Sequence, residues 1–528
     1  MNEIFKPATE SLWTENTAQF DYPQLKGRKS VDVAIIGGGM TGLTAALLLK
    51  KAGKSVAVVE MHHVGTGESG HTTAHLTELI DTGYSQLVSD FGVSGAKTAA
   101  SSGRAAIELI ALLSESLDID CDFERVPAYL YSEDRSGVSK LKKELKSLKK
   151  VGIRADYQKD IPLPFPIKGA VRIDDQAQFH PYRYMRGLAS AIHGKGSFVF
   201  ENSIVREVKE EKNSCTVRTD AGEITATDVI VATNSPSFCR MTLHTKISAY
   251  RTYAMAVEVD ADLSGKLRNV KGLFYDTADP YHYIRSQKID KINYWIIGGE
   301  DHKVGMEEDT DQRFAQLEAY SQERFDIKSV DYRWSGQIIE PMDGLPFIGL
   351  NPGSSHQYLA TGYSGNGMTF GTVAGMLCSD LILGVKNPWS ELYDPGRIHA
   401  KASAATFLSE NKDFPICFIK DRVAAPEATS LGEVSPGEGK IIKVNGKTAA
   451  VYRNLAGEVQ AVSPVCTHMG CYVRFNDSEK SWDCPCHGSR FGTDGEVLNG
   501  PAKKDLQPVS LEELSEAGAE RKKRSDAA

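Results

Sequence analysis

The sequence predicts a doubly wound parallel α/β domain, an antiparallel sheet that completes it, and a small all-β domain after them. Three observations lead to this fold class. A strand, a glycine turn, a helix and a second strand follow one another between Val33 and Glu60. Several β-like runs crowd residues 250–300, and short β-like runs alternate with glycine turns from Leu431 onward. A chain of 528 residues has room for about three domain-sized units.

The composition is that of an ordinary globular protein, with 41% hydrophobic and 25% charged residues. The formal net charge of −8 gives no reason to expect nucleic acid or an anionic membrane surface as a partner. No apolar run approaches the ~20 residues that a membrane span needs. The first residues lack a basic region followed by an apolar core, so we expect no signal peptide and a cytoplasmic location.

The glycine turn after the first strand is the most informative motif. Its six residues fit G-x-G-x-x-G and read Gly37, Gly38, Gly39, Met40, Thr41 and Gly42. The first glycine permits a tight turn, the second lets the backbone approach a pyrophosphate, and the third lets helix and strand pack closely. Glu60 ends the second strand, eighteen residues past the last glycine, where an acid can accept a hydrogen bond from a ribose hydroxyl. This context predicts a dinucleotide site.

The rest of the chain is predicted from periodicity and turn residues. Apolar spacing predicts helices over residues 84–118, 140–150, 182–193, 312–325 and 372–383. A hairpin is expected around residues 220–222 and a buried strand over 228–233. The domain boundaries that we predict are an N-terminal surface arm containing Trp13 (1–30), the large unit (31–395), a linker (396–430), the small β domain (431–515) and a basic tail (516–528).

Four further segments complete a family pattern. They are the loop 69–74 (Ser-Gly-His-Thr-Thr-Ala), the strand and turn 228–236, the segment 343–349 (Asp-Gly-Leu-Pro-Phe-Ile-Gly), and the glycine turn 362–368 between a strand and a helix. With the first glycine motif, they resemble the D-amino-acid-oxidase family of FAD oxidoreductases, which includes glycine, sarcosine and glutamylputrescine oxidases. The resemblance covers about residues 30–390.

This resemblance implies FAD in the doubly wound domain and substrate under the antiparallel sheet. The first glycine motif would hold the pyrophosphate, Glu60 the ribose, and the backbone of Val205 would face the adenine. The residues that would line the flavin are Ser69, Thr72, Thr73, Ala74, Gly362, Tyr363, Ser364, Gly365, Asn366, Gly367, Met368 and Thr369. His71 is either a covalent attachment point for the flavin or a loop residue that caps backbone groups.

The substrate residues depart from the family pattern. Relatives that oxidise amino acids carry arginines that grip the carboxylate, and the matching positions here are Gly365 and Ile339. A simple α-amino acid is therefore disfavoured, although Arg285 could replace those arginines. The substrate-facing candidates are Tyr253, Tyr281, His282, Tyr283 and Arg285. Ordinary aromatic packing in a half-buried strand is the alternative, and the catalytic residues stay unknown because the flavin itself takes the hydride.

A separate motif lies in the small β domain. Four of the nine cysteines fall within 21 residues, which in a reducing compartment favours a metal site. Cys466 and His468 form one C-x-H pair, and Cys484 and His487 form a C-x-x-H pair. Two thiolates and two imidazoles on two loops could hold zinc.

The whole motif strongly resembles the Rieske domain of cytochrome bc-type complexes. By this resemblance Cys466 and Cys484 bind one iron of a 2Fe–2S cluster, and His468 and His487 bind the other. The pair Cys471 and Cys486 is unnecessary for zinc but would tie the two loops together as a disulfide.

Two neighbours of the ligands set the expected redox potential. Ser489 matches the serine that hydrogen-bonds the cluster sulfur, whereas Phe491 stands where high-potential members have tyrosine. We therefore expect a potential below the upper end of the range for such clusters, which is roughly +300 mV.

These motifs together favour an FAD-dependent dehydrogenase that oxidises an amine-type or amino-acid-like substrate. Its electrons would pass singly to the Rieske cluster and on to an unknown acceptor. Two alternatives stay open: an oxygen-using amine oxidase with the cluster as redox sensor, and an electron-transfer protein without a small substrate. A Rieske oxygenase is disfavoured because no 2-His-1-carboxylate pattern is found.

Overall fold

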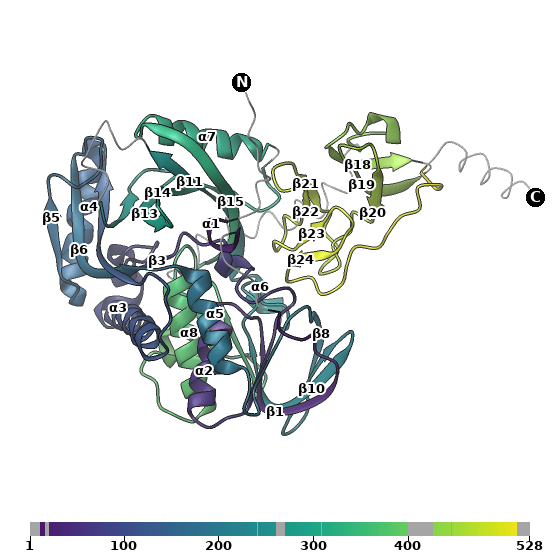
Figure 1. Ribbon diagram of the computed structural model, residues 1–528, viewed down its shortest axis with the longest axis horizontal. Coiled ribbons are helices and arrows are strands. Elements are labelled where there is room, and N and C mark those ends of the chain that lie inside the picture. Colours follow the sequence, from purple (N-terminus) through teal and green to yellow (C-terminus); the bar gives the residue numbers. More distant parts are fainter. Residues whose placement is uncertain are drawn as a thin grey trace, which may run out of the picture. The chain divides into compact units, whose positions relative to one another are not determined.

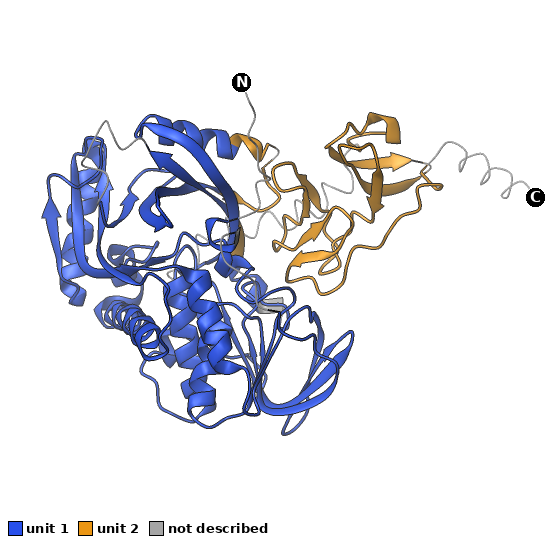
Figure 2. Cartoon of the chain, viewed as in Figure 1, with its two compact units in different colours: residues 1–247, 251–301, 313–404 blue, residues 248–250, 302–312, 405–528 orange. Residues whose placement is uncertain are grey.

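The computed structural model describes residues 11–15, 21–239, 241–259, 270–307, 309–399, 426–444 and 446–514. The chain divides into two compact units, shown in different colours in Figure 2. The first unit holds residues 1–247, 251–301 and 313–404, and the second holds residues 248–250, 302–312 and 405–528. The second unit thus joins two short segments from the middle of the chain to the part that carries the cysteine and histidine motifs.

An eight-stranded sheet forms the base of the first unit. In spatial order its strands are β16 (Phe347–Leu350), β17 (Gln357–Thr361), β10 (Gly222–Val231), β1 (Gly27–Ile36), β2 (Val56–Val59) and β7 (Phe198–Phe200), with β9 (Cys215–Thr219) beside β10 and β8 (Val205–Glu210) beside β9. The five strands from β17 to β7 run parallel, and β16 is antiparallel to β17. The chain leaves β1 toward β2 on one side and returns later as β10 on the other. The carboxyl end of β1 is therefore a topological switch point, where ligands of open α/β sheets bind.

Helices cover one face of this sheet (Figure 1). They are α2 (Met40–Lys51), α5 (Pro181–Ile192) and α8 (Gly367–Ile382), and the long α3 (Tyr84–Ser116) packs beside α8. On β1, Val33 and Ile35 face the helices, whereas Ala34 and Ile36 enter the core on the other face. Both faces of β1 are buried, which explains why its sequence is a continuous apolar run.

A nine-stranded sheet completes the first unit. In spatial order its strands are β15 (Ile327–Pro341), β11 (Ile247–Val259), β14 (Ile292–Lys303), β13 (His282–Ile289), β12 (Leu273–Asp276), β4 (Glu124–Ser132), β6 (Gly169–Gln178) and β3 (His75–Leu76), with β5 (Ala155–Gln158) beside β6. The helices α4 (Arg135–Val151) and α7 (Asp311–Gln322) accompany it. Strand β13 pairs antiparallel with both of its neighbours, as the β-like runs between residues 250 and 300 predict.

The second unit contains two small antiparallel sheets. One is formed by β18 (Gly439–Val444), β19 (Lys447–Arg453) and β20 (Val459–Val462), and the other by β21 (Arg474–Asn476), β22 (Ser481–Asp483), β23 (Arg490–Gly492) and β24 (Val497–Asn499). The loop between β20 and β21 and the loop between β22 and β23 carry the two ligand motifs. The short elements elsewhere in the chain are α1 (Leu12–Glu15), η1 (Glu68–Gly70), α6 (Met241–His244), α9 (Ser390–Tyr393) and η3 (Leu431–Glu433).

The predicted fold class is confirmed, with differences in detail. Helix α3 is interrupted at Gly92, whose φ of +71° breaks the helical backbone. Helix α8 begins at Gly367, five residues before the predicted start, because the turn before it is shorter than its glycine content suggested. No helix in the described part of the chain has the length and apolar character to cross a bilayer. The predicted basic tail, residues 516–528, lies outside the described residues.

The expectation of a surface arm is wrong for Trp13. Leu12 and Trp13 are completely buried, and the Trp13 ring packs edge-on against His180 at a centroid distance of 5.0 Å. The polar residues around Trp13 dominated the prediction, but one indole buries enough apolar surface to fix a short segment.

Candidate functional site

The first glycine turn links β1 to α2 in a backbone that only glycine accommodates. Gly37 has φ +108°, and a Cβ atom there would lie 2.3 Å from the carbonyl oxygen of Ala232. A Cβ at Gly42 would lie 2.0 Å from the carbonyl oxygen of Gly37. A Cβ at Gly39, the N-cap of α2, would lie 2.8 Å from Ser69 Oγ. This turn brings the N-terminus of α2 to the switch point, which is an anion-binding arrangement, and Met40 N there donates to Ser69 Oγ at 3.2 Å.

Glu60 lies beside this turn. Its Oε2 accepts a hydrogen bond from Gly38 N at 2.7 Å, and its Oε1 accepts one from His62 N at 3.0 Å. Ser203 N donates to the carbonyl oxygen of Glu60 at 2.9 Å, which brings the segment before β8, and therefore Val205, next to the end of β2. The carboxylate is fixed by the backbone on the side where the predicted ribose would lie.

The loop 69–74 has its carbonyl groups turned toward the protein. The side chains that donate hydrogen bonds to the carbonyls of residues 70–74 are, in order along the loop, Ser11, Trp334, Trp13 and Arg285. Among them, Trp13 Nε1 donates to Thr72 O at 2.6 Å. The N–H groups of Thr72 and Thr73 have no partner in the described part of the chain. The loop therefore presents free donors, as a bound cofactor requires.

The second glycine turn, Gly362 to Asn366, leads from β17 into α8 and meets the first. Tyr363 Oη and Thr41 Oγ1 share a hydrogen bond of 2.9 Å, which joins the starts of α8 and α2. Thr369 Oγ1 donates to Thr77 O at 3.2 Å. Two helix N-termini and the loop 69–74 thus converge, and this cradle of small residues, together with the N–H groups of Thr72 and Thr73, fits a dinucleotide such as FAD.

The five substrate-facing candidates divide between the two faces of the antiparallel sheet. Tyr281 and Tyr283 lie on one face, with ring centroids 5.7 Å apart. His282 projects to the opposite face and stacks on Tyr320 of α7 at 3.6 Å. Tyr253 also packs against α7, with its ring 4.7 Å from that of Phe314. Of these four residues, only Tyr281 and Tyr283 remain candidates for contact with the substrate.

Arg285 does not present its guanidinium to a ligand. The side chain is completely buried, and Nη1 donates to the carbonyls of Ala74 at 2.8 Å, Thr73 at 3.2 Å and Phe179 at 3.3 Å. Nη2 bonds to Gln287. Burial lowers the pKa of Arg285 to about 9, so the group is still charged at neutral pH. The expectation that Arg285 replaces the carboxylate-binding arginines is therefore wrong, because its donors hold the loop 69–74.

Two acids near the second glycine turn were not predicted from the sequence. Asp81 Oδ2 accepts a hydrogen bond from Gly365 N at 2.6 Å. Asp81 has solvent-accessible surface, and desolvation by the protein atoms around it raises its pKa to about 6. Burial also raises the pKa of Asp301 to about 7. Neither acid belongs to a motif, so no pattern in the sequence pointed to them.

The two cysteine–histidine loops of the second unit meet as predicted. Cys466 and Cys484 are buried and hydrogen-bonded to each other, and the rings of His468 and His487 lie with centroids 5.0 Å apart. Cys471 and Cys486 form a disulfide, with their sulfur atoms 2.03 Å apart. The thiols of Cys466 and Cys484 are outside this disulfide, and they lie on the same two loops as the two imidazoles.

The electrostatics of three of these four groups favour their metal-ligating forms, whereas the hydrogen bond with Cys466, together with burial, raises the pKa of Cys484. Burial lowers the pKa of His468 and that of His487 to about 4, which keeps both imidazoles neutral. The hydrogen bond with Cys484 is the main cause that lowers the pKa of Cys466 to about 7. Neutral imidazole and thiolate are the ligating forms. The buried Ser489 Oγ accepts a hydrogen bond from Ala502 N at 3.0 Å and also bonds to Cys466, so the residues present fit a Rieske-type cluster.

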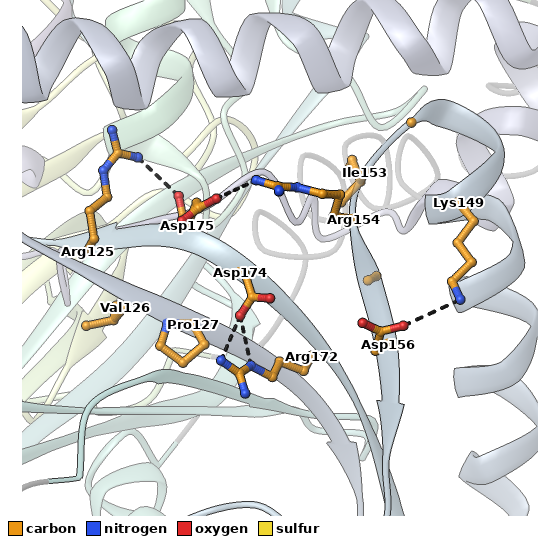
Figure 3. A pocket seen from close by; sticks show the side chains of 12 residues that line it. Arg125, Val126, Pro127, Lys149, Ile153, Arg154, Asp156, Arg172, Asp174 and Asp175 are labelled. Atoms are coloured by element: carbon orange, nitrogen blue, oxygen red, sulfur yellow. Dashed lines mark hydrogen bonds and ion pairs between the residues drawn. The ribbon is translucent and has the colours of Figure 1, made fainter.

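The first unit also has an outer hollow of about 870 Å³ between β4, β5 and β6. Figure 3 shows that its charged side chains pair with one another. The contacts are Arg154–Asp175 at 2.7 Å, Arg172–Asp174 at 2.8 Å, Arg125 to the carbonyl of Asp175 at 3.1 Å, and Lys149–Asp156 at 3.6 Å. Three of its basic side chains thus pair with acids in the hollow, and the fourth, Arg125, pairs with Glu108 at 2.6 Å, so we do not assign the substrate to this hollow.

Comparison with known proteins agrees with both sites. A family model described as FAD dependent oxidoreductase matches residues 32–381, and one described as Rieske [2Fe-2S] domain matches residues 426–510. The Bacillus subtilis protein YhfW, whose name assigns it a Rieske 2Fe-2S iron-sulfur centre, is 32% identical over 509 residues, which cover 96% of this chain and 99% of YhfW. Gamma-glutamylputrescine oxidoreductase of Escherichia coli is 25% identical over 67% of this chain and 84% of its own length.

Solved structures support the fold of the first unit. Glycine oxidase from Geobacillus kaustophilus superposes with a TM-score of 0.58 at 18% identity and covers 70% of this chain and 99% of its own. The fold, the glycine cradle and the ligand set identify an oxidoreductase that binds FAD and a 2Fe–2S cluster. The chain therefore belongs to the FAD dependent oxidoreductase family, with a Rieske [2Fe-2S] domain following the flavin-binding part.

Proposed function

We propose that the protein is a dehydrogenase for an amine-type substrate and that its electrons leave singly through the Rieske centre. Bound FAD would supply a two-electron hydride acceptor, and the cluster a one-electron carrier. The observation that carries the proposal is the presence, in one chain, of the glycine cradle and of a second group of residues, in which Cys466 and Cys484 lie outside the Cys471–Cys486 disulfide and the rings of His468 and His487 lie 5.0 Å apart.

The protein's own part in this reaction is to position and shield. The Thr41–Tyr363 hydrogen bond fixes the two helix N-termini at the cofactor, and Arg285 and Trp13 fix the loop 69–74. An aromatic face formed by Tyr281 and Tyr283 would hold the carbon next to nitrogen and exclude water.

Amine chemistry is supported by one relative. The name of gamma-glutamylputrescine oxidoreductase refers to a substrate that carries an amine. The proposal also includes a cytoplasmic location, which the free thiols of Cys121, Cys215 and Cys378 support, because reducing compartments preserve thiols.

The test is an anaerobic titration of the FAD-loaded protein with a panel of primary and N-methyl amines, in which the absorbance of the flavin is monitored. We expect bleaching by at least one amine. In air, the same substrate should yield far less than one peroxide per molecule consumed, because the electrons leave by another route. One peroxide per substrate would instead favour the oxygen-using oxidase, and no bleaching by any amine would contradict the amine assignment.

A further inference from the structure

The space that a side chain at residue 365 would need is filled by neighbouring side chains. A Cβ atom there would lie 2.8 Å from Asp81 Oδ2 and 3.2 Å from Tyr281 Oη. A side chain at residue 365 and the present position of Asp81 therefore exclude each other. Where a larger residue would project, the structure has a carboxylate and a phenol.

Aromatic rings continue from this point along one face of the sheet. Tyr281 lies 5.7 Å from Tyr283, Tyr283 lies 5.9 Å from His75, and His75 lies 5.1 Å from Tyr275, measured between ring centroids. Burial lowers the pKa of His75 well below its usual value, so the ring is neutral. Aromatic faces beside carboxylates attract ammonium groups, as in aromatic cages for quaternary amines.

The basic side chains nearest to these residues along β13 already have partners. The Arg285 guanidinium is bonded to the carbonyls of residues 73, 74 and 179. The His282 ring lies between Asp276 Oδ2 at 3.0 Å and Glu300 Oε1 at 3.2 Å, on the other face of the sheet. Neither side chain is placed to hold a substrate carboxylate beside Tyr281 and Tyr283.

Asp301 adds a second acid to this cluster. It is hydrogen-bonded to Thr252, whose Oγ1 also lies 2.7 Å from Tyr283 Oη. The Oδ1 atom of Asp301 is buried and has no hydrogen-bond partner in the described part of the chain. This oxygen atom therefore lacks a hydrogen-bond donor at a point close to Tyr283.

We propose that the cluster of Asp81, Asp301, Tyr281 and Tyr283 binds the ammonium group of an amine that carries no α-carboxylate. This inference rests on the proposed function, which supplies the reaction. It adds which class of amine the site selects. A carboxylate next to the amine would meet Asp81 at close range, and like charges at an interface cost affinity. The cluster thus selects alkylamines over the amino acids with the same side chain.

The experiment is calorimetric titration of the FAD-loaded protein with tetramethylammonium and, separately, with acetate. Both probes are redox-inert, so binding is measured apart from turnover. We expect tetramethylammonium to bind more tightly than acetate. In Asp81→Asn its affinity should fall about tenfold, since one nearby charge is lost, and Asp326→Asn, which removes one exposed charge before β15, should bind like the unmodified protein.

Tighter binding of acetate to the unmodified protein would overturn the inference, and this comparison needs no variant. Equal affinities for tetramethylammonium in Asp81→Asn and Asp326→Asn would also overturn it. Tetramethylammonium binding as expected, with no amine able to bleach the flavin, would support the cation site and refute the proposed function. Bleaching by amino acids, with no tetramethylammonium binding, would leave the dehydrogenase assignment standing and refute the cation site.

Discussion

Replacing Arg285 with glutamine tests whether this arginine holds the flavin loop or the substrate. In the structure its guanidinium is buried and donates to the carbonyls of Thr73 and Ala74. It also lies 5.5 Å from the centre of the Trp13 ring, which holds the same loop. A shorter, neutral side chain cannot reach these acceptors together.

The expected loss follows from the number of acceptors left without a donor. At least two buried carbonyls lose a charged partner, and each buried, unsatisfied group costs about 1–3 kcal/mol. The free energy of unfolding should therefore fall by about 2–6 kcal/mol in Arg285→Gln. Arg172→Gln is the control, because Arg172 is exposed and paired with Asp174, and a surface change of this kind stays within about 0.5 kcal/mol.

The assay is urea unfolding of the FAD-loaded variants, together with the dissociation constant of FAD. Arg285→Gln should unfold at lower urea concentration and bind FAD more weakly. If it kept both properties and raised KM for an amino acid alone, Arg285 would be a carboxylate ligand and the reading of the loop would be wrong.

Three further predictions concern the cluster and the buried acids. Phe491→Tyr should raise the cluster potential in a redox titration by roughly 40 mV, the equivalent of one hydrogen bond of ~1 kcal/mol, and an unchanged or lower potential would contradict the role of this position. His487→Ala should remove the cluster while FAD per chain stays unchanged, because the two sites lie in separate units; loss of FAD as well would count against independent folding. Asp301 has a pKa of about 7 in the folded protein, above its usual value, so it disfavours folding increasingly as pH rises toward 7. Asp301→Asn should therefore gain stability relative to the unmodified protein between pH 4 and pH 7 in urea unfolding, and a constant difference across that range would refute the raised pKa.

The parts of the fold that follow from local patterns could be predicted. The strand, glycine turn and helix around Gly37 depend on contacts within a few residues, so the spacing of the glycines in the sequence predicts the geometry of the turn. The ligands Cys466 and His487 are likewise fixed by short motifs. Trp13 was misplaced because its burial depends on Thr72 and His180, which are distant in the sequence.

The side of a strand that a residue faces was harder to predict. Tyr253 and His282 are aromatic residues near the expected site, but register turns them toward α7. A shift of one residue exchanges the faces of a strand, and no turn residue nearby fixes the register in the sequence. Asp81 escaped notice for a related reason, since only the fold brings it to Gly365.

Electron transfer from the flavin to the cluster is tested most directly by adding, without oxygen, an amine that bleaches the flavin. The electron paramagnetic resonance spectrum of the same sample is then recorded. We expect the signal of the reduced Rieske cluster to appear as the flavin is reduced, and the flavin of the His487→Ala variant to bleach without this signal. A bleached flavin beside a cluster that stays oxidised in the unmodified protein would contradict the proposed electron route.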